Sequence, residues 1–143
     1  MRSRFVAFLM VIATSSCRRD AEAPSSSADG VALALTLSSN QLNRGQSDTL
    51  AMTLTNTTSR SVSLSTGACD PRPIIVDTHN HVVVGAEPCI LILLRLQLAP
   101  GEQHRRLFVW RTDSLSPGVY HVRATFRADE VKLATPSETV RLN

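Results

Sequence analysis

The stretch from Leu98 to Phe126 constrains the fold more than any other part of the chain. It holds two Pro-Gly pairs, at 100–101 and 117–118, and each precedes an apolar-rich run. Proline presets the backbone for a turn and glycine accepts a positive φ, so such pairs separate β-strands. After the second pair the apolar residues are every second one: Tyr120, Val122, Ala124 and Phe126. This period of two predicts a strand with one buried and one solvated face.

The same pattern recurs along most of the chain, at roughly ten-residue intervals and between turn-forming residues. We expect strands at 31–37, 49–55, 62–64, 90–98, 103–110, 119–126 and 138–142, and a short hairpin with apolar flanks at 74–76 and 82–84. No segment shows a sustained helical period, so no long helix is expected. Short strands at this spacing are typical of an immunoglobulin-like sandwich. The sequence therefore predicts an all-β fold, an immunoglobulin-like β-sandwich of seven to eight antiparallel strands.

The amino terminus has the pattern of an export signal. Two arginines precede a nine-residue apolar run from Phe5 to Ala13, and small residues follow up to Cys17. The run is too short to span a bilayer and fits a secretory signal peptide. The placement of Cys17 resembles the lipobox of bacterial lipoproteins, which implies a signal peptide over residues 1–16 and acylation of Cys17. The alternative is ordinary signal cleavage near Ser16, which leaves a free thiol.

The segment that follows the signal is polar and has no apolar period. Residues 17–30 are expected to form a flexible tether, because they cannot bury enough surface to offset their ordering entropy. The sandwich is then expected over residues 31–143. Together these segments predict an exported domain of the cell envelope, held at a bacterial membrane by a lipid anchor.

Charge argues against nucleic acid as a partner. The chain has 15 basic and 12 acidic residues. Removing Arg2 and Arg4 with the signal leaves 13 basic residues against the same 12 acidic ones. A nucleic-acid-binding domain usually carries a strongly basic surface, so we expect a protein partner instead.

Several of these residues together suggest a family. The motifs are Leu54-Thr55-Asn56-Thr57, Val76-Asp77 before a hairpin, Leu98-x-Pro100-Gly101-Glu102, Trp110, and Pro117-Gly118-x-Tyr120-x-Val122. Their order resembles that of the intracellular proteinase inhibitor (BsuPI) family, over nearly all of Val31 to Leu142. The resemblance implies a β-sandwich and, through the founding member, inhibition of a serine protease.

The two remaining cysteines flank the expected hairpin. In an oxidising compartment Cys69 and Cys89 could close a loop of about twenty residues, which would stabilise the domain by roughly 3 kcal/mol. A metal thiolate pair is the alternative, but the short C-x-x-C spacing of zinc sites is missing. The loop also contains Pro71, Pro73 and Pro88, which would stiffen it. It is therefore the candidate protease-binding segment.

The hairpin itself contains three metal-ligand residue types. Asp77, His79 and His81 alternate, so in a continuous strand their side chains would share one face and could hold a metal. A turn at Asn80 would remove that alignment, and polar residues at a hairpin tip are ordinary. We therefore expect no metal and no other cofactor.

Two aromatic residues have candidate roles. Tyr120 lies near the start of a late strand, where a tyrosine corner would bond its hydroxyl to the backbone. Trp110 is either part of the core or an exposed anchor for a partner, because tryptophan is enriched in interface hot spots. Asn56-Thr57-Thr58 fits the N-glycosylation sequon, which we interpret as a chance match in a bacterial lipoprotein.

Motifs for catalysis are missing from the sequence. It contains no G-x-S-x-G, no H-E-x-x-H and no phosphate-binding glycine loop. We therefore expect a non-enzymatic, membrane-anchored lipoprotein whose sandwich is a protein-binding or accessory module. The alternatives are a proteinase inhibitor of the BsuPI type and a structural envelope lipoprotein without a discrete ligand.

Overall fold

The computed structural model describes residues 25–85 and 92–143. Within these two ranges the chain forms twelve β-strands and no helix. The described residues accordingly hold no helix that is long and apolar enough to cross a bilayer. The prediction of an all-β protein is confirmed.

The first sheet is antiparallel and has four strands. Its order is β1-β2-β4-β9, and β9 lies at one edge. Its strands are β1 (Ser25–Ala28), β2 (Val31–Thr36), β4 (Ser47–Asn56) and β9 (Gln103–Arg111). The pairing of β4 with β9 runs without a register shift from Ser47↔Arg111 to Thr55↔Gln103.

The second sheet is built around the longest strand, β10 (Gly118–Ala128). One neighbour of β10 is β12, which in turn pairs with β3 in parallel, and the other is β6, which pairs with β7. β11 forms a hairpin with the far end of β10. These strands are β3 (Gln41–Leu42), β6 (Arg72–Asp77), β7 (Val82–Val84), β11 (Val131–Ala134) and β12 (Glu138–Leu142).

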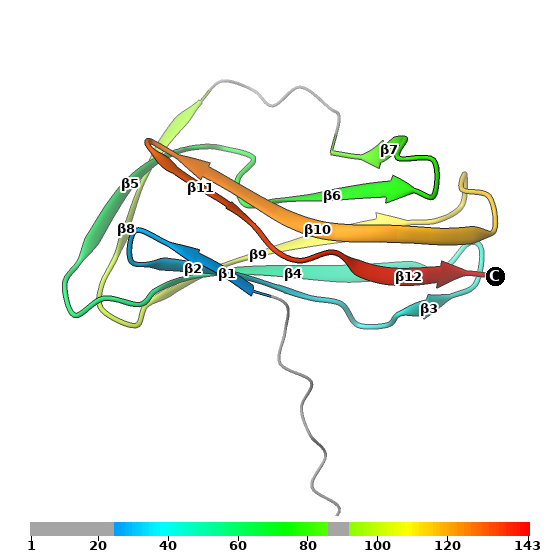
Figure 1. Ribbon diagram of the computed structural model, residues 1–143, viewed down its shortest axis with the longest axis horizontal. Helices are drawn as coiled ribbons and strands as arrows, with labels where there is room; N and C mark the ends of the chain where they lie inside the picture. The colour runs from blue at the N-terminus through cyan, green and yellow to red at the C-terminus, as the bar shows by residue number, and fades with distance from the viewer. Residues whose placement is uncertain (1–24, 86–91) are drawn as a thin grey trace, which may run out of the picture.

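A two-stranded ribbon extends the second sheet at one end of the molecule. It consists of β5 (Val62–Gly67) and β8 (Leu93–Leu98), which pair along their whole length. The ribbon joins the rest of the sheet through one residue pair, Ala128↔Thr66. In Figure 1 it crosses the left end of the two layers.

The strand order matches the immunoglobulin pattern. In that fold strands A, B and E form one sheet, and strands C, F and G form the other. Here β2, β4 and β9 take the places of A, B and E, and β6, β10 and β12 take those of C, F and G. Figure 1 shows the two sheets as layers, with β6 and β10 above β4. The β-sandwich is confirmed.

The core lies between the layers and is mostly aliphatic. It is formed by the inward residues of each strand, such as Leu33 and Leu35 of β2, Leu50 and Leu54 of β4, and Val122 of β10. All five have no exposed surface. Alternate residues of the same strands are more exposed, so the period of two in the sequence reports which residues face inward.

The ordered domain begins earlier than the sequence suggests. Ser25–Ala28 form β1 and pair with β2 through a tight turn at Asp29 and Gly30, both of which have positive φ. The expected tether over residues 17–30 is therefore wrong for its last six residues. β1 contains three serines and one alanine, so it has no apolar period to reveal it. It pairs because its backbone adds to the open edge of β2.

Candidate functional site

The edge strand β9 is the longest strand with an unpaired side among residues 25–85 and 92–143. In the described residues its only strand partner is β4, so the backbone groups on its other side are unpaired along nine residues. Edges of this length are usually protected by proline, a bulge or a covering loop. β9 contains no proline or glycine and its register with β4 is regular. Its backbone is thus a template for another strand.

The outward side chains of β9 combine apolar and basic groups. Leu107 and Val109 are 58% and 56% exposed, although both are aliphatic. Arg105 and Arg111 flank them on the same face and are also exposed. We call these four residues the outer ladder. Within the described part of the chain, neither arginine has an acidic partner within ion-pair distance.

The neighbouring strand leaves the outer ladder uncovered. The residues of β4 that lie opposite are Thr53, Ala51 and Thr49, which pair with Arg105, Leu107 and Val109 respectively. These threonine and alanine side chains are short. The long side chains of β9 therefore stand above the rest of this sheet face.

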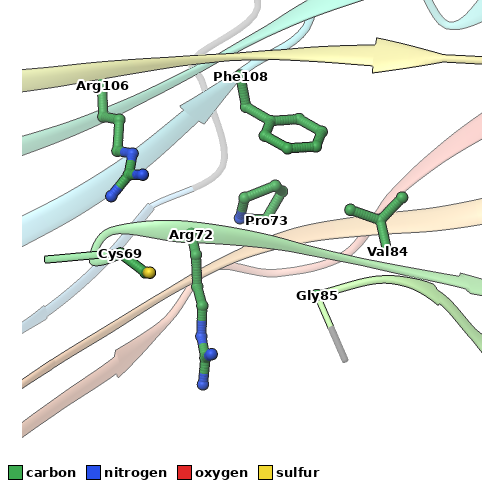
Figure 2. A pocket seen from close by; sticks show the side chains of 7 residues that line it. All are labelled: Cys69, Arg72, Pro73, Val84, Gly85, Arg106 and Phe108. Carbon is green, nitrogen blue, oxygen red and sulfur yellow. The ribbon is translucent and has the colours of Figure 1, made fainter. Parts of the chain in front are cut away.

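The inward side chains of β9 border a cavity at the open seam of the sandwich. The cavity has a volume of about 270 Å³ and lies between the edge of the first sheet and β6 and β7 of the second. Figure 2 shows Arg106 and Phe108 pointing from β9 toward β6, with Pro73 opposite Phe108. The lining residues are Cys69, Arg72, Pro73, Val84, Gly85, Arg106 and Phe108. An apolar wall with cations at its ends thus lies next to the unpaired edge.

The polar groups around the cavity are partly paired. Arg106 donates from Nη1 to the backbone oxygen of Ala68 at 2.8 Å. Arg72 Nε lies 3.9 Å from Asp70 Oδ1. Burial raises the pKa of the Asp70 carboxyl, and the positive charges of Arg72, Arg127 and Arg106 oppose that shift. Asp70 is thus one carboxyl among three arginines, so positive charge exceeds negative charge at this end of the seam.

Gly85 sets the width of the cavity at one end. Its φ is +98°, and a Cβ there would lie 2.5 Å from the backbone oxygen of Pro73. Only glycine allows the end of β7 to approach β6 this closely. The cavity wall therefore depends on a backbone contact as well as on side chains.

The hairpin of β6 and β7 turns at Asn80. This is the interpretation of the sequence in which Asp77, His79 and His81 do not share one face of a continuous strand. Asn80 has a φ of 62°, and its N–H donates to the backbone oxygen of Asp77 at 3.1 Å. Asp77 Oδ1 accepts from the N–H groups of His79 and His81 at 2.8 and 2.9 Å. These two hydrogen bonds lower the pKa of the Asp77 carboxyl, and the bond from His81 has the larger effect. In the described residues, no three side chains of metal-binding type converge.

Trp110 is part of the core. It is 1% exposed and packs edge-on against Tyr120, with ring centroids 5.8 Å apart. The interpretation of Trp110 as an exposed binding anchor is therefore wrong. Trp110 points inward because it lies on the same face of β9 as Phe108. The tyrosine corner is confirmed, since Tyr120 donates its hydroxyl to the backbone oxygen of Ser116 at 2.7 Å.

The sequence predicted an exposed loop between Cys69 and Cys89 that is stiffened by prolines. The first half of this segment is not an exposed loop. Pro71 and Pro73 are both buried, and Pro73 lies within β6 opposite Ala124. Pro71 is therefore wrong as an exposed contact residue, whereas Pro73 contributes to the wall of the cavity. Proline is tolerated at this position because β6 has a neighbour on one side only until Ile75, where β7 begins to pair. Pro88 lies outside the described residues.

Two of the predicted cysteine sites also lie outside the described residues, namely Cys17 and Cys89. The expected bond between Cys69 and Cys89 stays a prediction. Near Cys69, the N–H of Ala68 donates to the backbone oxygen of Ile92 at 3.0 Å. Ile92 follows Cys89 by three residues, and Ala68 directly precedes Cys69.

Asn56 has a structural role that excludes the glycosylation interpretation. It is 1% exposed, and its Nδ2 donates to the backbone oxygens of Arg60, Leu98 and Ala99. Its Oδ1 accepts from the N–H and the hydroxyl of Thr58. The side chain thus fixes the connection between β8 and β9 and the position at which the β9 edge begins.

The outer ladder was not among the residues singled out from the sequence. One signal was present: Leu107 to Trp110 is a run of four apolar residues, so both faces of the strand had to be apolar. Such a run is typical of a strand covered on both sides. Since β9 is instead an edge, the run marks exposed apolar surface, but strand order in a sheet is not readable from local sequence.

Comparisons with known proteins support the fold alone. No family model matches the sequence, and no curated protein matches it. Among solved structures it is similar to the C-terminal domain of wzt, with 11% identity, a TM-score of 0.52, and 86% of this chain and 79% of that chain covered. The β-glucosidase EmGH1 of Erythrobacter marinus has 12% identity, a TM-score of 0.50, and coverage of 83% and 16%. A β-glucosidase of Listeria innocua has 15% identity, a TM-score of 0.43, and coverage of 78% and 16%. The chain thus spans about a sixth of either glucosidase. At identities this low, the similarity to the wzt domain and to EmGH1 concerns the fold alone.

Proposed function

We propose that this chain is a non-enzymatic, exported lipoprotein whose β-sandwich binds another protein by adding an extended segment of that protein to β9. The observation that carries this proposal is the unpaired nine-residue edge of β9 beside an open cavity. In β-strand addition, main-chain hydrogen bonds supply affinity and pockets for alternate side chains supply specificity. Both elements are present along β9.

The exposed apolar residues of the outer ladder fit the same function. Leu107 and Val109 are apolar side chains that lie next to each other in the middle of a strand, and both are more than half exposed. Neighbouring apolar side chains exposed in this way are typical of a surface that a partner covers. Because each of the two is little more than half exposed, burying it against a partner would contribute roughly 1 kcal/mol. The arginines on either side keep the free edge soluble, since charge on an edge strand opposes aggregation.

The lipid anchor would hold this edge close to a membrane. Acylation at Cys17 leaves seven residues, 18–24, before β1 begins at Ser25. A fully extended chain spans at most about 3.6 Å per residue, so the domain would stay within roughly 30 Å of its anchor. A partner exposed at the membrane surface is therefore within reach.

Site-specific crosslinking in the producing cells tests this function. A photoreactive amino acid replaces Leu107 in the full chain, and a matched variant carries it at Thr139, an exposed position of β12 on the other sheet. We expect a discrete crosslinked species from position 107 that is missing from position 139. Equal crosslinking at both positions, or none at 107, would contradict binding at β9.

A proteinase inhibitor of the BsuPI type is the second candidate, favoured by the rigidity of the β6–β7 turn. Asp77 fixes the exposed turn through two bonds to its backbone, and a protease inhibitor needs such a rigid convex segment. A panel of serine proteases assayed with the purified chain at micromolar concentration tests it. Inhibition that is lost on replacing the turn residues 78–80 by glycine would support this role, and no inhibition would remove it.

A further inference from the structure

The chemistry of β9 specifies the kind of segment that it can bind. Resting on the function proposed above, we infer that the captured segment has the pattern acidic, any, apolar, apolar, apolar, any, acidic over seven consecutive residues. This pattern follows from the side chains that point outward and inward from Arg105 to Arg111.

The outward positions come from the outer ladder. Residues directly opposite one another on paired strands share a face and lie within contact distance. Opposite Arg105 and Arg111 an acidic residue forms an ion pair, and opposite Leu107 and Val109 an apolar residue covers the exposed side chain. The first, third, fifth and seventh positions of the segment are thereby assigned as acidic, apolar, apolar and acidic.

The inward position comes from the seam cavity. The fourth residue of the segment lies opposite Phe108, whose ring points into the cavity toward Pro73 (Figure 2). A cavity of about 270 Å³ lined by Phe108, Pro73 and Val84 has room for an apolar side chain. Next to the Phe108 ring the cavity wall is formed by Pro73 and Val84, so a charged group at this point would lose its hydration against apolar side chains. The fourth position is therefore apolar.

The second and sixth positions are less restricted. They lie opposite Arg106, which already donates to Ala68, and opposite Trp110, which the core covers. Trp110 offers no free pocket, and Arg106 keeps its positive charge, so the position opposite Arg106 tolerates a polar or an acidic residue. The full pattern is the same when read from either end, so it holds whether the segment pairs parallel or antiparallel to β9.

A second copy of this chain fits β9 poorly. Antiparallel pairing of two β9 strands can place Leu107 of each copy against Val109 of the other. The same register places Arg105 of each copy against Arg111 of the other, and like charges directly opposite are destabilising. β9 itself carries three arginines, one histidine and no acidic residue. Charge complementarity therefore favours an acidic partner.

Peptide binding to the full chain, purified in mild detergent, tests the pattern. The fluorescein-labelled probe contains the core Glu-Thr-Val-Leu-Val-Thr-Glu, and its charge-reversed counterpart has Lys in place of both Glu residues. A third peptide, Thr-Glu-Val-Leu-Val-Glu-Thr, moves both acidic residues to the inward face. By fluorescence anisotropy we expect the first peptide to bind at least tenfold more tightly than the other two.

A charge-reversed protein provides the decisive comparison. In the double variant R105E/R111E the preference should change, so that the lysine peptide binds at least tenfold more tightly than the glutamate peptide. The matched control K132E/R141E changes the net charge equally, at exposed residues of the second sheet, and should keep the preference of the unmodified chain. Circular dichroism verifies that both variants are folded.

Each remaining outcome counts against the inference. Equal binding of the three peptides, or no binding of any, would overturn the acidic and apolar pattern. If crosslinking from position 107 still gives a discrete partner in that case, the proposed function stands and only the pattern fails. A dimer in sedimentation that disappears in the L107E variant would instead identify a second copy as the occupant of β9.

Discussion

Asn56 offers the sharpest test of how the β9 edge is positioned, because one side chain fixes the preceding connection. In the N56A variant the carbonyls of Arg60, Leu98 and Ala99 lose the amide that lies 2.7, 3.0 and 3.0 Å away. Leu98 is buried, so water cannot replace the lost donor there, whereas Arg60 and Ala99 are exposed. An unsatisfied buried carbonyl costs about 1 to 3 kcal/mol, and the lost Thr58 bonds add about 1 kcal/mol.

The total predicted loss for N56A is about 3 kcal/mol, equivalent to a fall in Tm of roughly 10 °C for a domain of this size. Thermal unfolding followed by circular dichroism measures it. The T58A variant is the matched control: it also destroys the sequon but keeps the bonds of Asn56 to Leu98 and Ala99, so it should lose about 1 kcal/mol or less. If N56A unfolds within about 0.5 kcal/mol of the unmodified chain, a typical surface effect, the structural role given to this side chain is wrong.

Four further variants or treatments test other parts of the structure. Y120F removes one hydroxyl bond of 2.7 Å and should lower the free energy of unfolding by about 1 kcal/mol in urea titrations; no change would contradict the tyrosine corner. G85A should lower Tm, because the added Cβ would lie 2.5 Å from a backbone oxygen, and an unchanged melt would show that β7 can move away. Asp77 has a lowered pKa when folded, so its charge stabilises the fold above its ordinary value of 3.8, and this contribution is lost as pH falls through the lowered pKa. The Tm difference between the unmodified chain and D77N should therefore shrink over that acidic range, whereas a constant difference would exclude the charge as its source. Mass spectrometry of unreduced, alkylated protein should find Cys69 and Cys89 linked, and labelling of both thiols would end the disulfide prediction.

Local patterns were sufficient to predict most of the fold. Glu138 to Leu142 forms a strand with the predicted bounds, and the hairpin around Asn80 turns where its polar residues indicate. Both depend on interactions within a few residues, which sequence records directly. β1, β3 and β11 were missed: β1 has no apolar period, β3 is two residues long, and β11 is a four-residue strand with only two inward apolar residues.

The candidate site depends on contacts between distant parts of the chain, so the sequence could not specify it. Trp110 is buried because its face of β9 is turned toward β10, and Leu107 is exposed because no further strand pairs beyond β9 among the described residues. Alternation alone shows that the two residues occupy opposite faces. It does not show which face is inside, nor that β9 lies at an edge.

Amide hydrogen exchange along β9 tests the central claim most directly. In the full chain without a partner, the amides of Gln103 to Arg111 that face away from β4 should exchange quickly, and those bonded to β4 should exchange slowly. Addition of the Glu-Thr-Val-Leu-Val-Thr-Glu peptide should slow the first set and leave the amides of β12 unchanged. Protection of the outward-facing amides before any peptide is added, or no change after binding, would contradict an open edge that accepts a strand.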